Sequence, residues 1–223
     1  MGVEDQPIRS SARGGVASSA VDGLHRTGVA AWFRFVGECL RSPLAVGAIV
    51  PSSRLLTETI LAGCNLAACE TVVELGPGSG TFTRHILERI GKATTFLAIE
   101  LNVANAAVLR KRFPQLAVYN DSAAQIQRCL AQHGKQRADC IISGLPWGNF
   151  SIATQNPIID AVFSAVAPAG MFTTFAYLHA GWYPTTKNFR RRMRNRFDAI
   201  EATPVIWRNI PPAFVFRCRK PTL

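Results

Sequence analysis

Hydrophobic and polar positions divide the chain into an unpatterned start and a patterned remainder. Residues 1–27 carry few large apolar side chains and show no periodicity, which predicts a flexible tail. Apolar positions then recur at helical spacing over residues 29–41, which predicts an amphipathic helix that carries Trp32 and Phe33. We therefore expect one domain, residues 28–223, that opens with this helix.

Beyond this helix, apolar runs of strand length alternate with helical patterns. Ser52 or Ser53 can cap a helix that ends near Gly63. Strands are predicted at residues 71–75, 94–100, 116–119, 139–143 and 171–177. Helices are predicted at residues 82–90, 102–113, 122–133 and 156–167, the last with Asn156 as its cap and Pro157 in its first turn.

The C-terminal part adds a basic helix over residues 187–196 and two extended runs, 199–207 and 213–218. Pro211 and Pro212 separate the two runs, as is typical of a hairpin at the edge of a sheet. Alternating strands and helices predict an α/β fold of the Rossmann-like type. We expect a seven-stranded, mostly parallel sheet with helices on both faces and a C-terminal antiparallel hairpin.

The charge balance is strongly basic, with 25 Lys and Arg against 14 Asp and Glu and a formal net charge of +11. This excess favours an anionic partner, either nucleic acid or acidic lipid, without choosing between them. The cysteines form no C-x-x-C pair and no metal-ligand spacing with histidine, so no metal is predicted. No signal segment and no run of roughly 18 apolar residues is present, so we expect a cytoplasmic protein that does not span a membrane.

The sharpest motif is VVELGPGSG at residues 72–80, where a strand turns into a helix through Gly76, Gly78 and Gly80. A dinucleotide-binding loop would need glycine at the next position, which is Thr81. Glu74 would repel a pyrophosphate, but it suits the cationic methionine part of S-adenosylmethionine. The motif therefore indicates a methyltransferase and not a dehydrogenase.

Polar residues follow the next strands of the predicted sheet. Glu100 is placed to accept hydrogen bonds from both ribose hydroxyls, and Asp121, followed by Ser122, is placed to meet the adenine amine. Gly144 follows the fourth strand and completes the predicted cofactor residues. A plain glycine-rich turn with solvated acids is the structural alternative, but acids at three successive strand ends favour a cofactor site.

Four segments carry a resemblance: GAIVPSSR at residues 47–54, ELGPGSG at 74–80, SGLPW at 143–147 and RNIPPA at 208–213. Over residues 30–220 the chain resembles the bacterial soluble-type phospholipid N-methyltransferases, a branch of the class I S-adenosylmethionine-dependent methyltransferases. The resemblance implies methylation of a lipid head-group amine, on phosphatidylethanolamine and its methylated derivatives or on ornithine lipid. It also implies peripheral association with the inner face of the cytoplasmic membrane, and we infer no obligate protein partner.

Two alternatives stay open. In the ribosomal RNA adenine dimethyltransferases, the loop after the fourth strand reads Asn-Leu-Pro-Tyr, and the Asn side chain helps to hold the target amine. The corresponding residue here is Gly144, which has no side-chain acceptor, and no separate C-terminal helical domain for RNA follows. The second alternative is an inactive cofactor-binding fold that serves as a membrane-associated scaffold.

Amine methylation needs a neutral nitrogen held in line with the methyl group. Tyr177, at the end of the fifth strand, is the predicted catalytic helper, and His179 is a weaker candidate. Trp147 is the other predicted catalytic residue, because its ring could stack on the methylated ammonium. The alternative for Trp147 is that it fills the core.

Two surfaces are predicted to bind an anionic membrane. Trp32 and Phe33 would enter the head-group region with their helix, unless that helix packs over the cofactor site. The second surface is the basic run 187–196, in which Phe189, Met193 and the following Phe197 are expected to add an apolar layer. RNA phosphates would suit this run equally well. Its predicted membrane-binding cations are Arg190, Arg191, Arg192 and Arg194.

Overall fold

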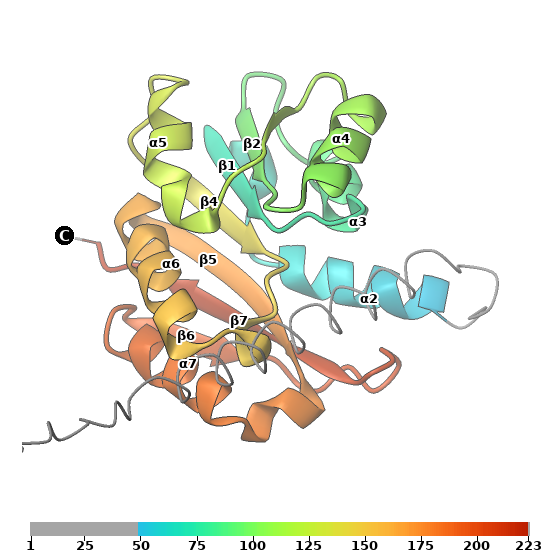
Figure 1. Cartoon of the computed structure of the whole chain (residues 1–223), viewed down its shortest axis with the longest axis vertical. Helices are drawn as coiled ribbons and strands as arrows, with labels where there is room; N and C mark the ends of the chain where they lie inside the picture. The colour runs from blue at the N-terminus through green and yellow to red at the C-terminus, as the bar shows by residue number, and fades with distance from the viewer. Residues whose placement is uncertain (1–48, 223) are drawn as a thin grey trace, which may run out of the picture.

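The computed structural model describes residues 49–222, with side chains from residue 54 onward (Figure 1). The expected tail at residues 1–27 and the amphipathic helix with Trp32 and Phe33 lie outside the described residues, so those expectations stay predictions.

A seven-stranded sheet with strand order β3-β2-β1-β4-β5-β7-β6 forms the centre of the described part of the chain. The strands are β1 Thr71–Leu75, β2 Thr95–Ile99, β3 Ala117–Tyr119, β4 Ala138–Ser143, β5 Val166–Tyr177, β6 Ala199–Ala202 and β7 Ala213–Arg219. Strands β1 to β5 pair in parallel, and β7 pairs antiparallel with both β5 and β6. The predicted fold class and C-terminal hairpin are confirmed.

Helices cover both faces of this sheet (Figure 1). They are α2 Ile49–Leu61, α3 Thr81–Leu87, α4 Val103–Arg112, α5 Ile126–Ala131, α6 Ile152–Ala165 and α7 Pro184–Arg194. Neighbouring strand residues point to opposite faces. Val73 therefore packs in the cluster that contains α5, α6 and α7, whereas Val72 packs in the cluster that contains α2, α3 and α4. All five residues of β1 are buried, as expected for a central parallel strand.

Two helix starts differ from the prediction. Within the described residues helix α2 covers Ile49–Leu61, so Ser52 and Ser53 lie inside it and the predicted cap is wrong. Helix α6 begins at Ile152, and Ser151 caps it by accepting a hydrogen bond from the Thr154 N–H at 3.1 Å. The predicted start at residues 156 and 157 is therefore also wrong.

The earlier start of α6 has a packing reason. It places Gln155 inside the protein, where the Gln155 side chain is fully buried and donates to the carbonyls of Trp147 at 2.6 Å and Thr185 at 3.1 Å. These contacts join α6 to the loop after β4, where Trp147 lies in the 3-10 helix η3 Trp147–Asn149, and to the first turn of α7, which holds Thr185. They outweigh the missing backbone N–H of Pro157, which local sequence reasoning treats as a reason to start the helix there.

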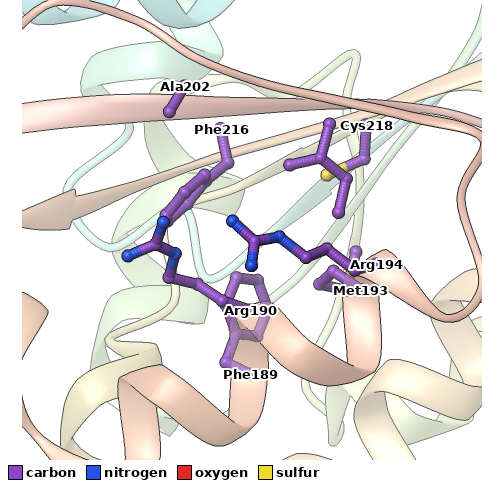
Figure 2. Close-up of a pocket in the computed structure, with 8 residues that line it drawn as sticks. Phe189, Arg190, Met193, Arg194, Ala202, Phe216 and Cys218 are labelled. Carbon is purple, nitrogen blue, oxygen red and sulfur yellow. The ribbon is translucent and has the colours of Figure 1, made fainter.

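Helix α7 turns its apolar residues toward the sheet. Phe189, Met193 and the following Phe197 are at most 4% exposed and belong to the core. The expected apolar layer for a membrane is therefore wrong, because these side chains fill the space between α7 and the strands. Arg190 and Arg194 extend from α7 toward the hairpin and line a small pocket beside Phe216 and Cys218 (Figure 2).

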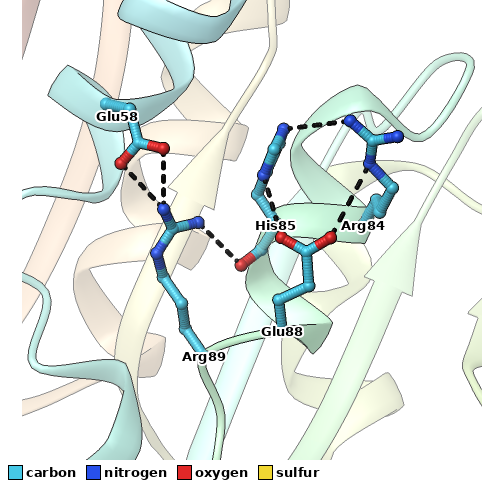
Figure 3. A network of polar contacts seen from close by, with 5 residues as sticks. All are labelled: Glu58, Arg84, His85, Glu88 and Arg89. Carbon is cyan, nitrogen blue, oxygen red and sulfur yellow. Dashed lines mark hydrogen bonds and ion pairs between the residues drawn. The ribbon is translucent and has the colours of Figure 1, made fainter.

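A polar network joins α2 to the rest of the domain (Figure 3). Arg89 donates to both carboxylate oxygens of Glu58, at 2.8 and 2.7 Å, and to the His85 carbonyl at 2.9 Å. Glu58 lies on α2, and Arg89 lies just after α3. Both contacts with Glu58 come from one guanidinium nitrogen, Nη2, and hydrogen bonds between charged groups are stronger than those between neutral ones. The network thus anchors α2 to the helix that follows the glycine loop.

Candidate active site

The carboxyl ends of the parallel strands meet at one edge of the sheet. Leu75 at the end of β1 is in register with Ile99 of β2 and Ser143 of β4. The loops that follow these strands therefore emerge side by side, which is where ligands of such sheets bind. Two contacts join them directly: the Gly78 N–H donates to Glu100, and the Gly144 N–H donates to the Leu75 carbonyl at 2.8 Å.

The glycine loop leaves its backbone accessible at Gly78. This residue has φ +57°, a left-handed conformation that glycine adopts without steric cost. A side chain added there would meet no atom within 4 Å, so the space above the loop is open. A ligand can approach the backbone closely at this point, which is the function that the sequence motif predicts.

Gly144 has the opposite environment. A Cβ atom at this position would lie 2.6 Å from the Gly76 carbonyl oxygen. The loop after β4 can therefore pack against the glycine loop only if residue 144 has no side chain. The same distance shows that an Asn, as found in the RNA adenine dimethyltransferases, does not fit here without movement of the backbone.

Glu74 lies fully buried beneath the glycine loop. Its Oε2 atom accepts a hydrogen bond from the Thr83 hydroxyl at 2.7 Å, while Oε1 has no partner among the described residues. Burial raises the pKa of the Glu74 carboxyl from 4.5 to about 8; the Thr83 hydrogen bond opposes this rise, and the charge of Glu100 adds to it. A buried acid with an unsatisfied oxygen fits a ligand that brings a cationic group, as S-adenosylmethionine does.

Glu100 is held at the loop by two backbone donors. Its carboxylate accepts from the Gly78 N–H at 2.9 Å and from the Asn102 N–H at 2.8 Å. An ionised carboxylate has about four lone-pair sites, so acceptor capacity remains for the ribose hydroxyls that the sequence assigns to it. Asn120 supports the same turn, because its side chain donates to the carbonyls of Glu100 and Leu101 at 2.9 and 3.0 Å.

Asp121 and Ser122 take part in local structure. The Asp121 carboxylate accepts from the Ser122 N–H at 2.8 Å and forms an ion pair with Arg128 of α5. The Ser122 hydroxyl accepts from the Ala124 N–H at 3.3 Å and so starts a short 3-10 helix, η2 Ala123–Gln125. The Arg128 side chain is 64% exposed, and a pair with one such partner is weak enough for a ligand to displace. The adenine contact assigned to Asp121 and Ser122 stays a prediction.

A recess of about 100 Å³ lies beside the cofactor residues. It is built from the loop after β4, the end of β5, the 3-10 helix η4 Leu178–Trp182 and Pro211. Its lining residues are Gly144, Leu145, Pro146, Trp147, Gly148, Asn149, Phe175, Ala176, Tyr177, His179, Ala180 and Pro211. Because Gly144 also touches the glycine loop, the recess adjoins the predicted cofactor site and is the candidate methyl-acceptor site.

Tyr177 and His179 lie together in this recess. Their rings stack with centroids 5.7 Å apart and planes inclined by 10°. Tyr177 ends β5, as the sequence predicts, and η4 brings His179 to the same place. The Tyr177 hydroxyl and the His179 imidazole each bring a group to the recess that can donate or accept a hydrogen bond.

Trp147 packs in the core. Its side chain is enclosed, with the residue only 2% exposed, and its Nε1 donates to the Thr174 hydroxyl at 3.0 Å. The indole stacks on Phe189 of α7 with ring centroids 4.6 Å apart. This arrangement matches the core-filling alternative and does not support a cation-π role. Trp147 instead fixes the loop that carries Gly144.

The cations of α7 fall into two groups. Arg192 and the following Arg196 both pair with Asp160 of α6. Arg190 lies with its guanidinium 5.8 Å from the Phe216 ring centre, and Arg191 donates to the Asn188 side chain at 3.1 Å. No ion pair joins Arg190, Arg191 or Arg194 to an acidic residue of the described chain. The structure thus assigns Arg192 to an internal contact and leaves the charges of the other three uncompensated.

Residues 49–222 contain no helix of the length and apolar character needed to cross a membrane. The same residues hold no group of three His, Cys, Asp or Glu side chains that could bind a metal ion.

Comparison with known proteins gives relatives by sequence and by fold. No protein-family model matches the chain. An ornithine lipid N-methyltransferase from Singulisphaera acidiphila is 30% identical over 192 residues, which cover 84% of this chain and 95% of the relative.

Two solved N-methyltransferases share the fold at low identity. NodS from Bradyrhizobium japonicum is 14% identical with a TM-score of 0.58 and matches 77% of this chain and 98% of its own. The 1,6-didemethyltoxoflavin-N1-methyltransferase from Burkholderia thailandensis is 15% identical with a TM-score of 0.58 and matches 95% of this chain and 93% of its own. Both proteins have been solved with S-adenosylhomocysteine bound.

The strand order, the glycine loop and the acids at the strand ends define a class I methyltransferase that uses S-adenosylmethionine. Within this class, the chain belongs to the bacterial lipid N-methyltransferase family that includes the Singulisphaera enzyme. The predicted cofactor and the family resemblance are thereby confirmed.

Proposed function

We propose that the protein methylates the amine of a membrane lipid head group at the membrane surface, with ornithine lipid or phosphatidylethanolamine as acceptor. The relationship to an ornithine lipid N-methyltransferase over nearly its whole length carries this proposal. The position of the recess supports it, because Gly144 lies both in the recess and against the cofactor loop.

The cofactor supplies an activated methyl group. The residues suited to hold it are Glu74, with its unsatisfied buried oxygen, Glu100 beside the loop and half-buried Gly78, above which the space is open. The Gly144 contact sets the distance between the loop after β4 and the glycine loop. Acceptor and cofactor are therefore held by two segments whose spacing is fixed by backbone contact, as methyl transfer between aligned atoms requires.

The acceptor amine must lose a proton, because an alkylammonium has a pKa near 10 and no free lone pair. The recess favours the neutral amine in two ways. Its walls include Pro146, Phe175 and Pro211, and an apolar environment lowers the pKa of a bound amine. Tyr177 and His179 offer polar atoms that can accept the proton or relay it to water.

The uncompensated cations of α7 suit an anionic bilayer. Arg190, Arg191 and Arg194 lack ionic partners in the described chain. Each cation close to an anionic membrane contributes about 1 kcal/mol, so three provide reversible, salt-sensitive attachment. Arg192 is paired with Asp160 and should contribute less.

The test is transfer of radiolabelled methyl from S-adenosylmethionine by the purified full chain. Vesicles of ornithine lipid, vesicles of phosphatidylethanolamine and ribosomal RNA are offered in parallel, and the products are separated by chromatography. We expect label in one or both lipids and none with a Glu100→Ala variant. Label in RNA alone would overturn the proposal, and cofactor binding without any transfer would favour the inactive scaffold.

A further inference from the structure

Two exposed tryptophans and an isoleucine stand near the recess. Trp182 is 79% exposed, Trp207 is 70% exposed and Ile210 is 61% exposed. Single exposed apolar residues are ordinary, but large side chains grouped at the mouth of a ligand site are a common mark of an interaction surface. We call Trp182, Trp207 and Ile210 the acceptor rim.

Backbone contacts place the acceptor rim beside the recess. The Leu178 N–H donates to the Pro212 carbonyl at 2.8 Å, and Tyr177 pairs with Ala213, so η4 and the loop before β7 lie next to each other. Trp182 ends η4, whose His179 and Ala180 line the recess. The loop before β7 contributes Pro211 to the same recess and carries the other two rim residues, Ile210 directly before Pro211 and Trp207 four positions before it.

Buried Asn209 holds the rim loop in shape. Asn209 is 6% exposed, its N–H donates to the Ile206 carbonyl at 3.1 Å, and its side chain donates to the Pro211 carbonyl at 2.7 Å. With Asn209 turned inward, Trp207 and Ile210 on either side remain in solvent. The exposure of these apolar side chains therefore comes from an ordered turn.

The charges around the acceptor rim are of one sign. Residues 178–189 and 203–216, which carry the rim, contain one cation each, Lys187 and Arg208, and no Asp or Glu. Lys187 and Arg208 are exposed, and Arg208 lies between the two apolar residues of the rim loop. Tryptophan with flanking cations and no acids is the composition that lies stably at an anionic lipid-water boundary.

We propose that the acceptor rim enters the head-group region of the bilayer, so that the recess opens onto the membrane and a lipid amine reaches Tyr177 while its chains stay in the bilayer. This inference rests on the proposed function, since it names the surface through which that function meets its substrate. It adds an apolar contact to the electrostatic attachment by α7.

The test compares two variants of the full chain. The rim variant carries Trp182→Ser and Trp207→Ser; its matched control carries Val103→Ser and Val108→Ser, which are 69% and 54% exposed on α4. Helix α4 contacts β3, which lies at the opposite edge of the sheet from the hairpin, so the control removes exposed apolar surface far from the rim.

Binding is measured by sedimentation with phosphatidylethanolamine and phosphatidylglycerol vesicles in high salt, where electrostatic attachment is screened. We expect the rim variant to bind about tenfold or more weakly and the control to bind like the parent. Tryptophan emission of the parent should be quenched by brominated lipid, and the rim variant should lose most of that quenching. Rim-variant binding and quenching equal to those of the parent would overturn the inference.

Activity separates this inference from the proposed function. The rim variant should lose methyl transfer to lipid in vesicles but keep transfer to a water-soluble, short-chain amine analogue. If the rim variant transfers methyl to vesicle lipid as well as the parent does, the inference about the acceptor rim is overturned and the proposed function still stands. If vesicle binding depends on the rim but the parent transfers methyl to no lipid, the inference about the rim stands and the proposed function is overturned. A rim-dependent dimer with unchanged vesicle binding would assign the surface to a second copy and overturn the inference.

Discussion

At the scale of single residues, the Glu74 carboxylate has opposite effects on stability and on cofactor binding. As a buried anion it lowers the stability of the fold, whereas its negative charge favours the cationic cofactor. Its pKa is 4.5 when unperturbed and about 8 in the folded chain, so between these pH values the folded state holds more protons than the unfolded state. Stability therefore falls as pH rises through this window. We predict that Glu74→Gln removes that fall, so the variant gains thermal stability relative to the parent near pH 8 and not near pH 4.5.

The same Glu74→Gln variant should bind S-adenosylhomocysteine more weakly, because the amide cannot compensate the cationic amino group. Calorimetric titration and thermal melts measure the two effects, with Glu88→Gln as control, since the Glu88 side chain is 55% exposed near the end of α3. Unchanged affinity would remove Glu74 from the cofactor site. A stability difference that does not vary with pH would contradict burial as the cause of the raised pKa.

Gly144 is the glycine of the described residues at which an added Cβ atom would make the shortest contact. We predict that Gly144→Ala lowers the free energy of unfolding by about 1–3 kcal/mol and abolishes most methyl transfer, because the added carbon would lie 2.6 Å from the Gly76 oxygen. Denaturant melts and the transfer assay measure this. Gly181→Ala is the control, because its added carbon meets nothing within 4 Å. Equal behaviour of the two variants would mean that the loops move apart easily.

At the scale of elements, α7 contains cations with different roles. We predict that the double change Arg190→Gln and Arg194→Gln weakens binding to anionic vesicles at low salt by about tenfold or more, at roughly 1 kcal/mol per cation. Changing Arg192 and Arg196 to Gln should weaken vesicle binding less, since both already pair with Asp160. Vesicle sedimentation across a salt series compares them. Equal losses of vesicle binding in the two double variants would contradict the division of the α7 cations into paired and uncompensated groups.

The elements also show what local sequence patterns could predict. The strands were predictable because a central parallel strand such as β1 is buried on both faces and is rich in β-branched residues, here Thr71, Val72 and Val73. The start of α6 was not, because the contacts of buried Gln155 with Trp147 and with Thr185 of α7 decide it. Periodicity predicts that α7 has an apolar face. It does not predict whether Phe189 on that face packs against the sheet or enters a membrane.

At the scale of the whole molecule, the cofactor side was predictable and the acceptor side only in part: the sequence picks out Tyr177, His179 and Trp147, which line the recess, but not its other walls. Gly78 and Glu100 are recognisable in sequence because each follows a strand, and parallel strands end at one edge of a sheet. The recess is assembled from residues 144–149, 175–177, 179–180 and 211, so no single local pattern marks it. Thr83, Asn102 and Asn120 were missed for a similar reason, since isolated hydroxyl and amide residues carry little signal without their partners.

The most direct test of the central claim is the lipid composition of cells. The chain is expressed in a bacterial host that makes ornithine lipid and phosphatidylethanolamine but no methylated form of either, and lipid extracts are analysed by mass spectrometry. We predict new species heavier by one or more methyl groups on the head-group amine, absent when Glu100→Ala is expressed to the same level. Unchanged lipids together with newly methylated adenines in ribosomal RNA would contradict the account.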